Sequence, residues 1–150
     1  MRRLVAVLLL VACFSAGCSR AATPDLATPT HYRQMVMADA NRVAGAVNTA
    51  HASCTGETVE ACREALTTQG AVARQETKWL RSVRRPQDCD RLVHNYLILV
   101  DDARYYFDRV QTSAAQGDRA AVQQMANERY VSFARGWRAI SDASPGDVCR

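Results

Sequence analysis

The sequence lacks the short motifs that identify most metal, haem and hydrolytic sites. No two of its six cysteines are three positions apart, so neither the CxxC pairs of zinc sites nor the CxxCH motif of covalently bound haem is present. None of the five glutamates is followed by a histidine three positions later, which excludes the Glu-x-x-His pairs of di-iron bundles. No Gly-x-Ser-x-Gly stretch occurs either. We therefore expect no cofactor, no metal and no enzymatic activity.

Lysine is almost absent, because the basic residues are 18 arginines and one lysine. With 15 acidic residues the whole chain has a formal net charge of +4. Arg2 and Arg3 belong to an N-terminal segment that we expect to be removed, and without them 17 basic residues face 15 acidic ones. So small an excess, with no aromatic residues interleaved among basic ones, argues against nucleic acid as a partner.

Long apolar runs are also scarce, and the chain has a single one, at its start. The stretch MRRLVAVLLLVACFSAGC has a basic beginning, an apolar centre from Leu4 to about Phe14 and a final group of small residues. This three-part pattern is typical of a secretory signal peptide. Its apolar centre is too short to cross a bilayer as a mature transmembrane helix. We therefore expect secretion across the cytoplasmic membrane.

The end of this stretch, SAGC, resembles the signal of bacterial lipoproteins, in which small residues precede a cysteine that is acylated and becomes the new N-terminus. The resemblance implies a signal peptide over residues 1–17 and a lipid anchor on Cys18, on the outer side of the membrane. Cleavage at Cys18 leaves four cysteines, the even number that disulfide pairing requires. We therefore favour Cys18 as the lipidation site.

Two alternatives to Cys18 stay open. LVAC, ending at Cys13, fits the lipoprotein pattern better at its leucine, but cleavage there leaves only about eight apolar residues, near the lower limit for such regions. It also leaves Cys18 as an unpaired thiol. Ordinary secretion with cleavage after Ala21 leaves the same four cysteines and no lipid.

The stretch SRAATPDLATPT follows Cys18 and contains two prolines, three threonines and few apolar residues. Such a composition predicts a flexible tether, which we place over 18–29. The remainder, 30–150, is expected to form one domain.

Apolar residues then recur at spacings of three and four, which predicts amphipathic helices. The first helix should begin near Thr30 as its N-cap and end at Gly56. The second should cover 58–85 and stop at Pro86. The apolar line of the first helix consists of Tyr32, Val36, Ala40, Val43, Val47, Ala50 and Cys54.

The third helix should begin at Asp88 or Asp90, either of which can act as an N-cap. Gly117 and Asp118 predict a helix–helix junction, since glycine accepts the left-handed conformation that ends a helix and aspartate caps the next one. The fourth helix should end at Ser144. No stretch alternates between apolar and polar residues over the length of a strand, so the expected class is all-α.

Each helix is expected to have about 24 to 28 residues, or roughly 36–42 Å at 1.5 Å per residue. Short connections between helices of matched length predict an up-down-up-down four-helix bundle. That topology places Cys54 with Cys62 at one end, and Cys89 with Cys149 at the other. We therefore predict these two disulfides and no zinc site shared among the four cysteines.

No residue pattern identifies a partner. The leading hypothesis is a non-catalytic envelope lipoprotein that binds a protein, a glycan or a lipid. Its basic residues near the tether, Arg81, Arg84, Arg85 and Arg91, form a possible membrane-facing patch. The alternative is a carrier that holds a small ligand or a metal in the bundle interior, near the polar residues Gln69, Glu76 and Tyr96.

Overall fold

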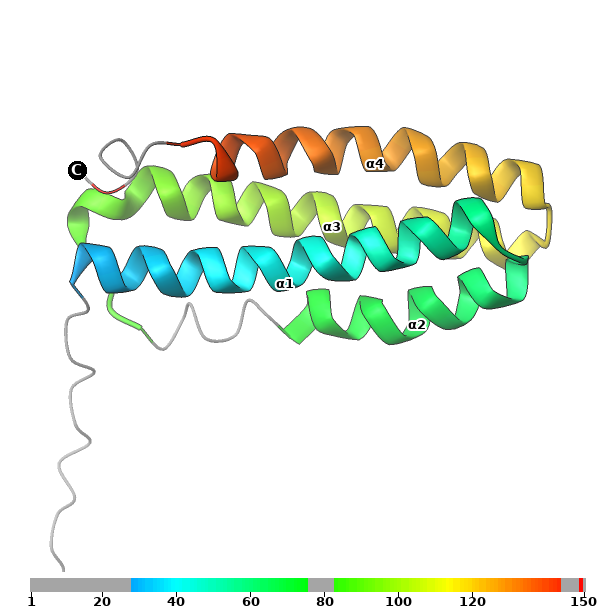
Figure 1. The fold of residues 1–150 in the computed structure, drawn as a ribbon, viewed down its shortest axis with the longest axis horizontal. Coiled ribbons are helices and arrows are strands. Elements are labelled where there is room, and N and C mark those ends of the chain that lie inside the picture. The colour runs from blue at the N-terminus through cyan, green and yellow to red at the C-terminus, as the bar shows by residue number, and fades with distance from the viewer. Residues whose placement is uncertain (1–27, 76–82, 144–148, 150) are drawn as a thin grey trace, which may run out of the picture.

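The computed structural model describes residues 28–75, 83–143 and 149. Within these ranges the chain forms α helices, one short 3-10 helix and no strand, which confirms the all-α class (Figure 1). The elements are α1 (Pro29–Gly56), α2 (Val59–Gln75), η2 (Gln87–Cys89), α3 (Asp90–Gln116) and α4 (Arg119–Ser141).

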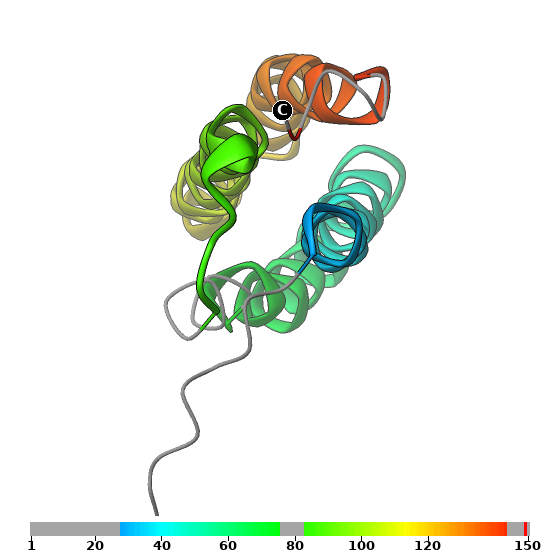
Figure 2. The same ribbon diagram turned by 90° about the vertical axis from the view of Figure 1, so that its left-hand side faces the viewer.

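The four α helices form an up-down-up-down bundle, as predicted. Each helix packs on its neighbours in the chain, and α4 returns to pack on α1 (Figure 1, Figure 2). At one end of the bundle lie the N-termini of α1 and α3 and the C-terminus of α4, and we call this the proximal end. The α1–α2 and α3–α4 junctions lie together at the opposite, distal end (Figure 1).

Both disulfides form as predicted, one at each end of the bundle. Cys54 bonds to Cys62 across the α1–α2 junction at the distal end. Cys89, which closes η2, bonds to Cys149 at the proximal end and joins positions 60 apart in the sequence.

Capping residues set two of the helix starts. The N-cap of α1 is Thr28, whose hydroxyl accepts the His31 N–H at 3.2 Å, so α1 begins at Pro29 rather than after the expected Thr30 cap. Proline suits the first helical position because it has no N–H to leave unbonded. The predicted junction before α4 is confirmed: Gly117 has a φ of 81°, and Asp118 accepts the N–H groups of two following residues.

The expectation that the second helix reaches residue 85 is wrong. α2 is described over Val59–Gln75, and α1, α3 and α4 have 28, 27 and 23 residues. Residues 83–86, before η2, are not helical. Pro86 disfavours helical backbone at Arg85, so the chain reaches α3 through an extended approach. The segment 76–82 lies outside the described residues.

The interior is filled by the apolar lines of all four helices. Its largest fully buried side chains are aromatic, and their rings occupy the space between the helices. They are Tyr32, Tyr96, Tyr106, Phe107 and Phe133. The start predicted for α3 is confirmed at Asp90, although no side chain caps this helix.

Candidate functional sites

Two of the three polar residues expected to form an interior ligand site, Gln69 and Tyr96, lie within the described residues. Tyr96 is fully buried within the core, and Gln69 is half-buried on α2. Neither lines a described hollow of the surface. Glu76 lies outside the described residues.

A surface hollow of about 390 Å³ lies between α2 and α3, and its lining residue Gly70 follows Gln69 in the sequence. Its floor includes Gly70 and Phe107, and Arg74 and Arg104 contribute charge. A Cβ at position 70 would lie 3.4 Å from the Phe107 ring, so glycine leaves the floor open. The Arg104 guanidinium pairs with Asp101 at 3.5 Å.

Three members of the expected basic patch lie at the proximal end. Arg84, Arg85 and Arg91 are exposed, and Arg81 lies outside the described residues. Arg85 pairs with Asp90 at 3.0 Å. Within 28–75, 83–143 and 149, no carboxylate forms an ion pair with the other two arginines. The patch is therefore only partly neutralised.

The basic segment lies directly beside the start of α1. Thr28, Pro29, Arg84 and Arg85 line one hollow of about 640 Å³. Tyr32, one turn into α1, is buried, and burial raises the pKa of its hydroxyl while the positive charge of Arg85 lowers it. The structure thus brings together two segments that are more than 50 positions apart in the sequence.

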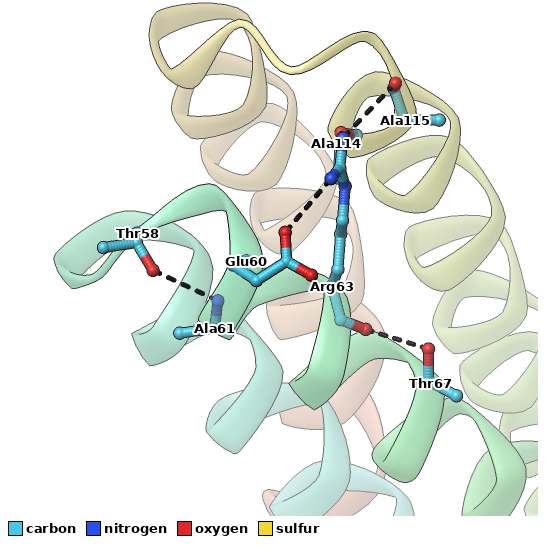
Figure 3. A network of polar contacts seen from close by, with 7 residues as sticks. All are labelled: Thr58, Glu60, Ala61, Arg63, Thr67, Ala114 and Ala115. Atoms are coloured by element: carbon cyan, nitrogen blue, oxygen red, sulfur yellow. Dashed lines mark hydrogen bonds and ion pairs between the residues drawn. The ribbon is translucent and has the colours of Figure 1, made fainter.

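The distal end is closed by an arginine that the sequence analysis did not select. Arg63 of α2 donates from Nε and Nη2 to the Ala114 carbonyl oxygen at 2.9 and 2.7 Å (Figure 3). Its Nη1 also pairs with Glu60 at 3.1 Å. The Ala114 carbonyl oxygen also accepts the Gly117 N–H at 3.1 Å, and Nη2 of Arg63 reaches the Ala115 carbonyl oxygen at 3.4 Å. Arg63 thus supplies donors from the neighbouring helix to the carbonyl groups at the end of α3.

A second side chain closes the same end between α4 and α1. The amide of Gln123 donates to the Thr55 carbonyl oxygen at 2.9 Å. Thr55 lies in the last turn of α1, so this bond also satisfies a helix C-terminus. No local sequence motif predicts this bond or the Arg63 bond, because each forms between segments that are distant in the sequence and meet only when the helices pack.

A polar aromatic cluster joins α1, α3 and α4. His51 stacks on Tyr130, with ring centroids 4.0 Å apart, and meets Tyr106 edge-on at 6.4 Å. The Tyr130 hydroxyl donates to Asn48 at 2.9 Å. Burial lowers the pKa of His51 and raises that of Tyr106, so both groups are held neutral.

Two polar atoms of this cluster are buried without a hydrogen bond to any described residue. They are Nδ1 of His51 and the hydroxyl oxygen of Tyr106. The ring contacts and the Tyr130–Asn48 hydrogen bond join α1, α3 and α4 at this point. The sequence signal for it is a histidine that directly follows Ala50 on the apolar line of α1.

Over the described ranges, no three His, Cys, Asp or Glu side chains come together as metal ligands would. No helix among these residues is long and apolar enough to cross a membrane. Comparison of the chain with known protein families, with curated proteins and with solved structures finds no match.

Proposed function

We propose that this chain is a non-catalytic lipoprotein of the bacterial cell envelope. An acylated Cys18 would anchor it on the outer side of the cytoplasmic membrane, and its helical domain would bind a protein, glycan or lipid partner. Free secretion after cleavage behind Ala21 remains the alternative. The proposal rests on the N-terminal sequence and on the place where the helical domain begins.

The carrying observation is that α1 begins beside the exposed arginines. Ten peptide links join Cys18 to Thr28, and a fully extended chain of that length spans at most about 36 Å. A lipid on Cys18 would therefore keep the proximal end near the bilayer. The shared hollow of Thr28, Pro29, Arg84 and Arg85 places positive charge at the same end.

Electrostatics supports this orientation. A basic residue very near an anionic lipid surface gains on the order of 1 kcal/mol. Arg84 and Arg91 are exposed and have no ion pair in the described part of the chain, so both charges are available for such an attraction. Arg85 contributes less because it already pairs with Asp90.

The anchor is tested by the intact mass of protein extracted from membranes, measured with and without reductant. We expect a mature chain that begins with acylated Cys18 and has no free thiol before reduction. Cys13→Ser should leave the mass of the mature protein unchanged, because Cys13 lies in the signal peptide that is removed. Cys18→Ser should abolish acylation. An unmodified chain that begins at Ala22, or acylation that survives in Cys18→Ser, would refute the proposed anchor.

A carrier function is the second candidate, and the hollow between α2 and α3 favours it. Phe107 supplies an apolar wall, and the two arginines Arg74 and Arg104 line the hollow with a single carboxylate, Asp108. This lining suits a small amphiphilic anion better than a metal cation. Gly70→Leu should fill the hollow. If an anionic fluorescent fatty acid binds the wild-type protein and the variant equally, this candidate fails.

A further inference from the structure

A third hollow, on the face between α3 and α4, has a different chemistry from the other two. It has a volume of about 280 Å³, and its lining residues include polar and charged ones whose apolar stems, with Met125 and Ala121, form most of its surface. Arg109, Thr112 and Gln116 come from α3, and Gln124 and Glu128 come from α4. Residues with hydroxyl, amide and guanidinium donors thus line one small space, while Glu128 supplies the only carboxylate among its lining residues.

The guanidinium of Arg109 is held in place by an aromatic ring. Its Cζ lies 4.9 Å from the centroid of the Tyr105 ring, one turn earlier on α3. Arg129 of α4 contacts the same ring, again at 4.9 Å. Its Nε also donates to the Met125 sulfur at 3.5 Å. One tyrosine thus orients two arginines from two helices. Because these arginine side chains are already restricted, binding a ligand costs less side-chain entropy.

These two charges lack the neutralising partners that other arginines have. Arg42, Arg63 and Arg85 each have a carboxylate oxygen within 3.1 Å. In the described ranges no carboxylate lies within ion-pair distance of Arg109 or Arg129. Two like charges therefore share one ring, and an incoming anion would relieve their repulsion.

Glu128 limits which anion the hollow accepts. One of its carboxylate oxygens accepts a hydrogen bond from the Gln124 amide at 2.9 Å, so this acid stays within the hollow. Its negative charge repels a dianion more strongly than a monoanion. A planar carboxylate matches the paired donors of a guanidinium group.

From this geometry we propose that the α3–α4 hollow binds the carboxylate group of a small ligand through Arg109. Tyr105 and Arg129 act as positioning residues. The site goes beyond the proposed anchoring, since it lies on the side of the bundle and does not depend on a lipid at Cys18. Two sources of the carboxylate fit this chemistry, the C-terminal carboxyl of a peptide and the carboxyl of an acidic sugar.

The test is an NMR titration of the purified protein with its disulfides intact. Acetylglycine represents a peptide carboxyl end, galacturonate represents an acidic sugar, and inorganic phosphate is the competing anion. We expect saturable shifts of the Arg109 and Gln124 side-chain signals with at least one carboxylate, weakening as salt is added. The carboxylate that binds more tightly identifies the source. No saturable shift with either carboxylate, or tighter binding of phosphate, would overturn the proposal.

Variants separate the proposed site from general attraction to a basic protein. Arg109→Gln should weaken carboxylate binding about tenfold or more, because a charge-assisted pair is lost. The matched control is Arg138→Gln, which removes an equally exposed arginine of α4 away from the hollow and should leave affinity unchanged. Equal weakening by both variants would show that the attraction is nonspecific and would refute the site.

Further variants test the roles of Tyr105 and Glu128. Tyr105→Phe keeps the ring and should keep affinity, whereas Tyr105→Ala should weaken binding several-fold by releasing Arg109. Glu128→Gln should strengthen binding of both carboxylates by removing the repulsion. All these side chains are at least partly exposed, so the far-UV circular dichroism of each variant should match that of the wild type. Unchanged affinity in Tyr105→Ala would refute the positioning role.

Discussion

The two ends of the bundle are closed in different ways. At the distal end, Arg63 and Gln123 bond to the last carbonyls of neighbouring helices, and the Cys54–Cys62 disulfide spans a short junction. At the proximal end, Cys89–Cys149 joins positions 60 apart, and a large hollow and exposed arginines surround the start of α1. The distal contacts therefore bond helix C-termini to neighbouring helices, whereas at the proximal end Arg84 and Arg91 are exposed and have no ion pair among the described residues.

The largest expected difference between the ends concerns the disulfides. Replacing Cys89 and Cys149 by serine should lower the free energy of unfolding by up to about 4 kcal/mol, because a long loop regains its freedom in the unfolded chain. Replacing Cys54 and Cys62 should cost up to about 2.5 kcal/mol, since the loop is short. Urea unfolding of both double variants measures the two values. A larger loss from the distal pair would contradict the chain-entropy explanation.

The distal arginine provides the next largest effect. Arg63→Ala removes the side chain that bonds to the Ala114 carbonyl, and a hydrogen bond to a charged donor contributes about 1.5–3 kcal/mol. Partial exposure of Arg63 favours the lower part of this range. The same urea experiment applies. Arg74→Ala, on the same helix and exposed, is the matched control and should change stability by less than about 0.5 kcal/mol.

The features that could be predicted from sequence are those set by local chemistry. Apolar spacing gave the four helices, Gly117 and Asp118 marked the last junction, and the alternating topology then paired the cysteines. The second helix was expected to reach residue 85, because Leu80 and Val83 continue its apolar line in the sequence, whereas residues 83–86 are not helical. Periodicity describes one face of a helix and does not specify where its neighbours stop packing on it.

The candidate sites were harder to predict for a related reason. Tyr96 is buried in the core and Gln69 is half-buried on α2. Arg84 and Arg85 lie beside the start of α1, as expected, because the alternating topology places both segments at the same end. The Arg63 bond joins positions 51 apart, and Tyr105 meets Arg129 across two helices. Such contacts depend on how each packed helix is rotated about its axis relative to its neighbours, and this rotation cannot be read from a single sequence.

A smaller effect is expected at the proximal end. Arg84→Gln and Arg91→Gln should each weaken binding of the protein to vesicles that contain phosphatidylserine by up to about fivefold, since each charge contributes at most about 1 kcal/mol near the surface. Sedimentation with vesicles measures the binding. The distal variant Arg63→Gln is the control and should bind as the wild type does. Equal weakening by the distal variant would show that the two ends do not differ in their attraction to lipid.

The smallest effect should come from His51, on the distal half of α1. Burial lowers its pKa in the folded protein, so the unfolded chain binds more protons as the pH falls below the ordinary histidine value of about 6.5. Stability contributed by neutral His51 is therefore present at pH 7.5 and is lost on acidification. The rings of Tyr106 and Tyr130 contact His51 from α3 and α4, and burial raises the pKa of Tyr106, so this hydroxyl stays neutral over this range.

Urea unfolding at pH 7.5 and at pH 5.0 measures this contribution. His51→Gln should lose less stability between the two pH values than the wild type does, because its side chain does not titrate. The exposed His94→Gln is the matched control and should keep the pH dependence of the wild type. The expected difference is small because His51 is only half-buried, so its charged form retains part of its hydration. Identical pH dependence in all three proteins would mean that solvent reaches the His51 imidazole freely. It would also mean that the stacked rings do not shield His51 from water.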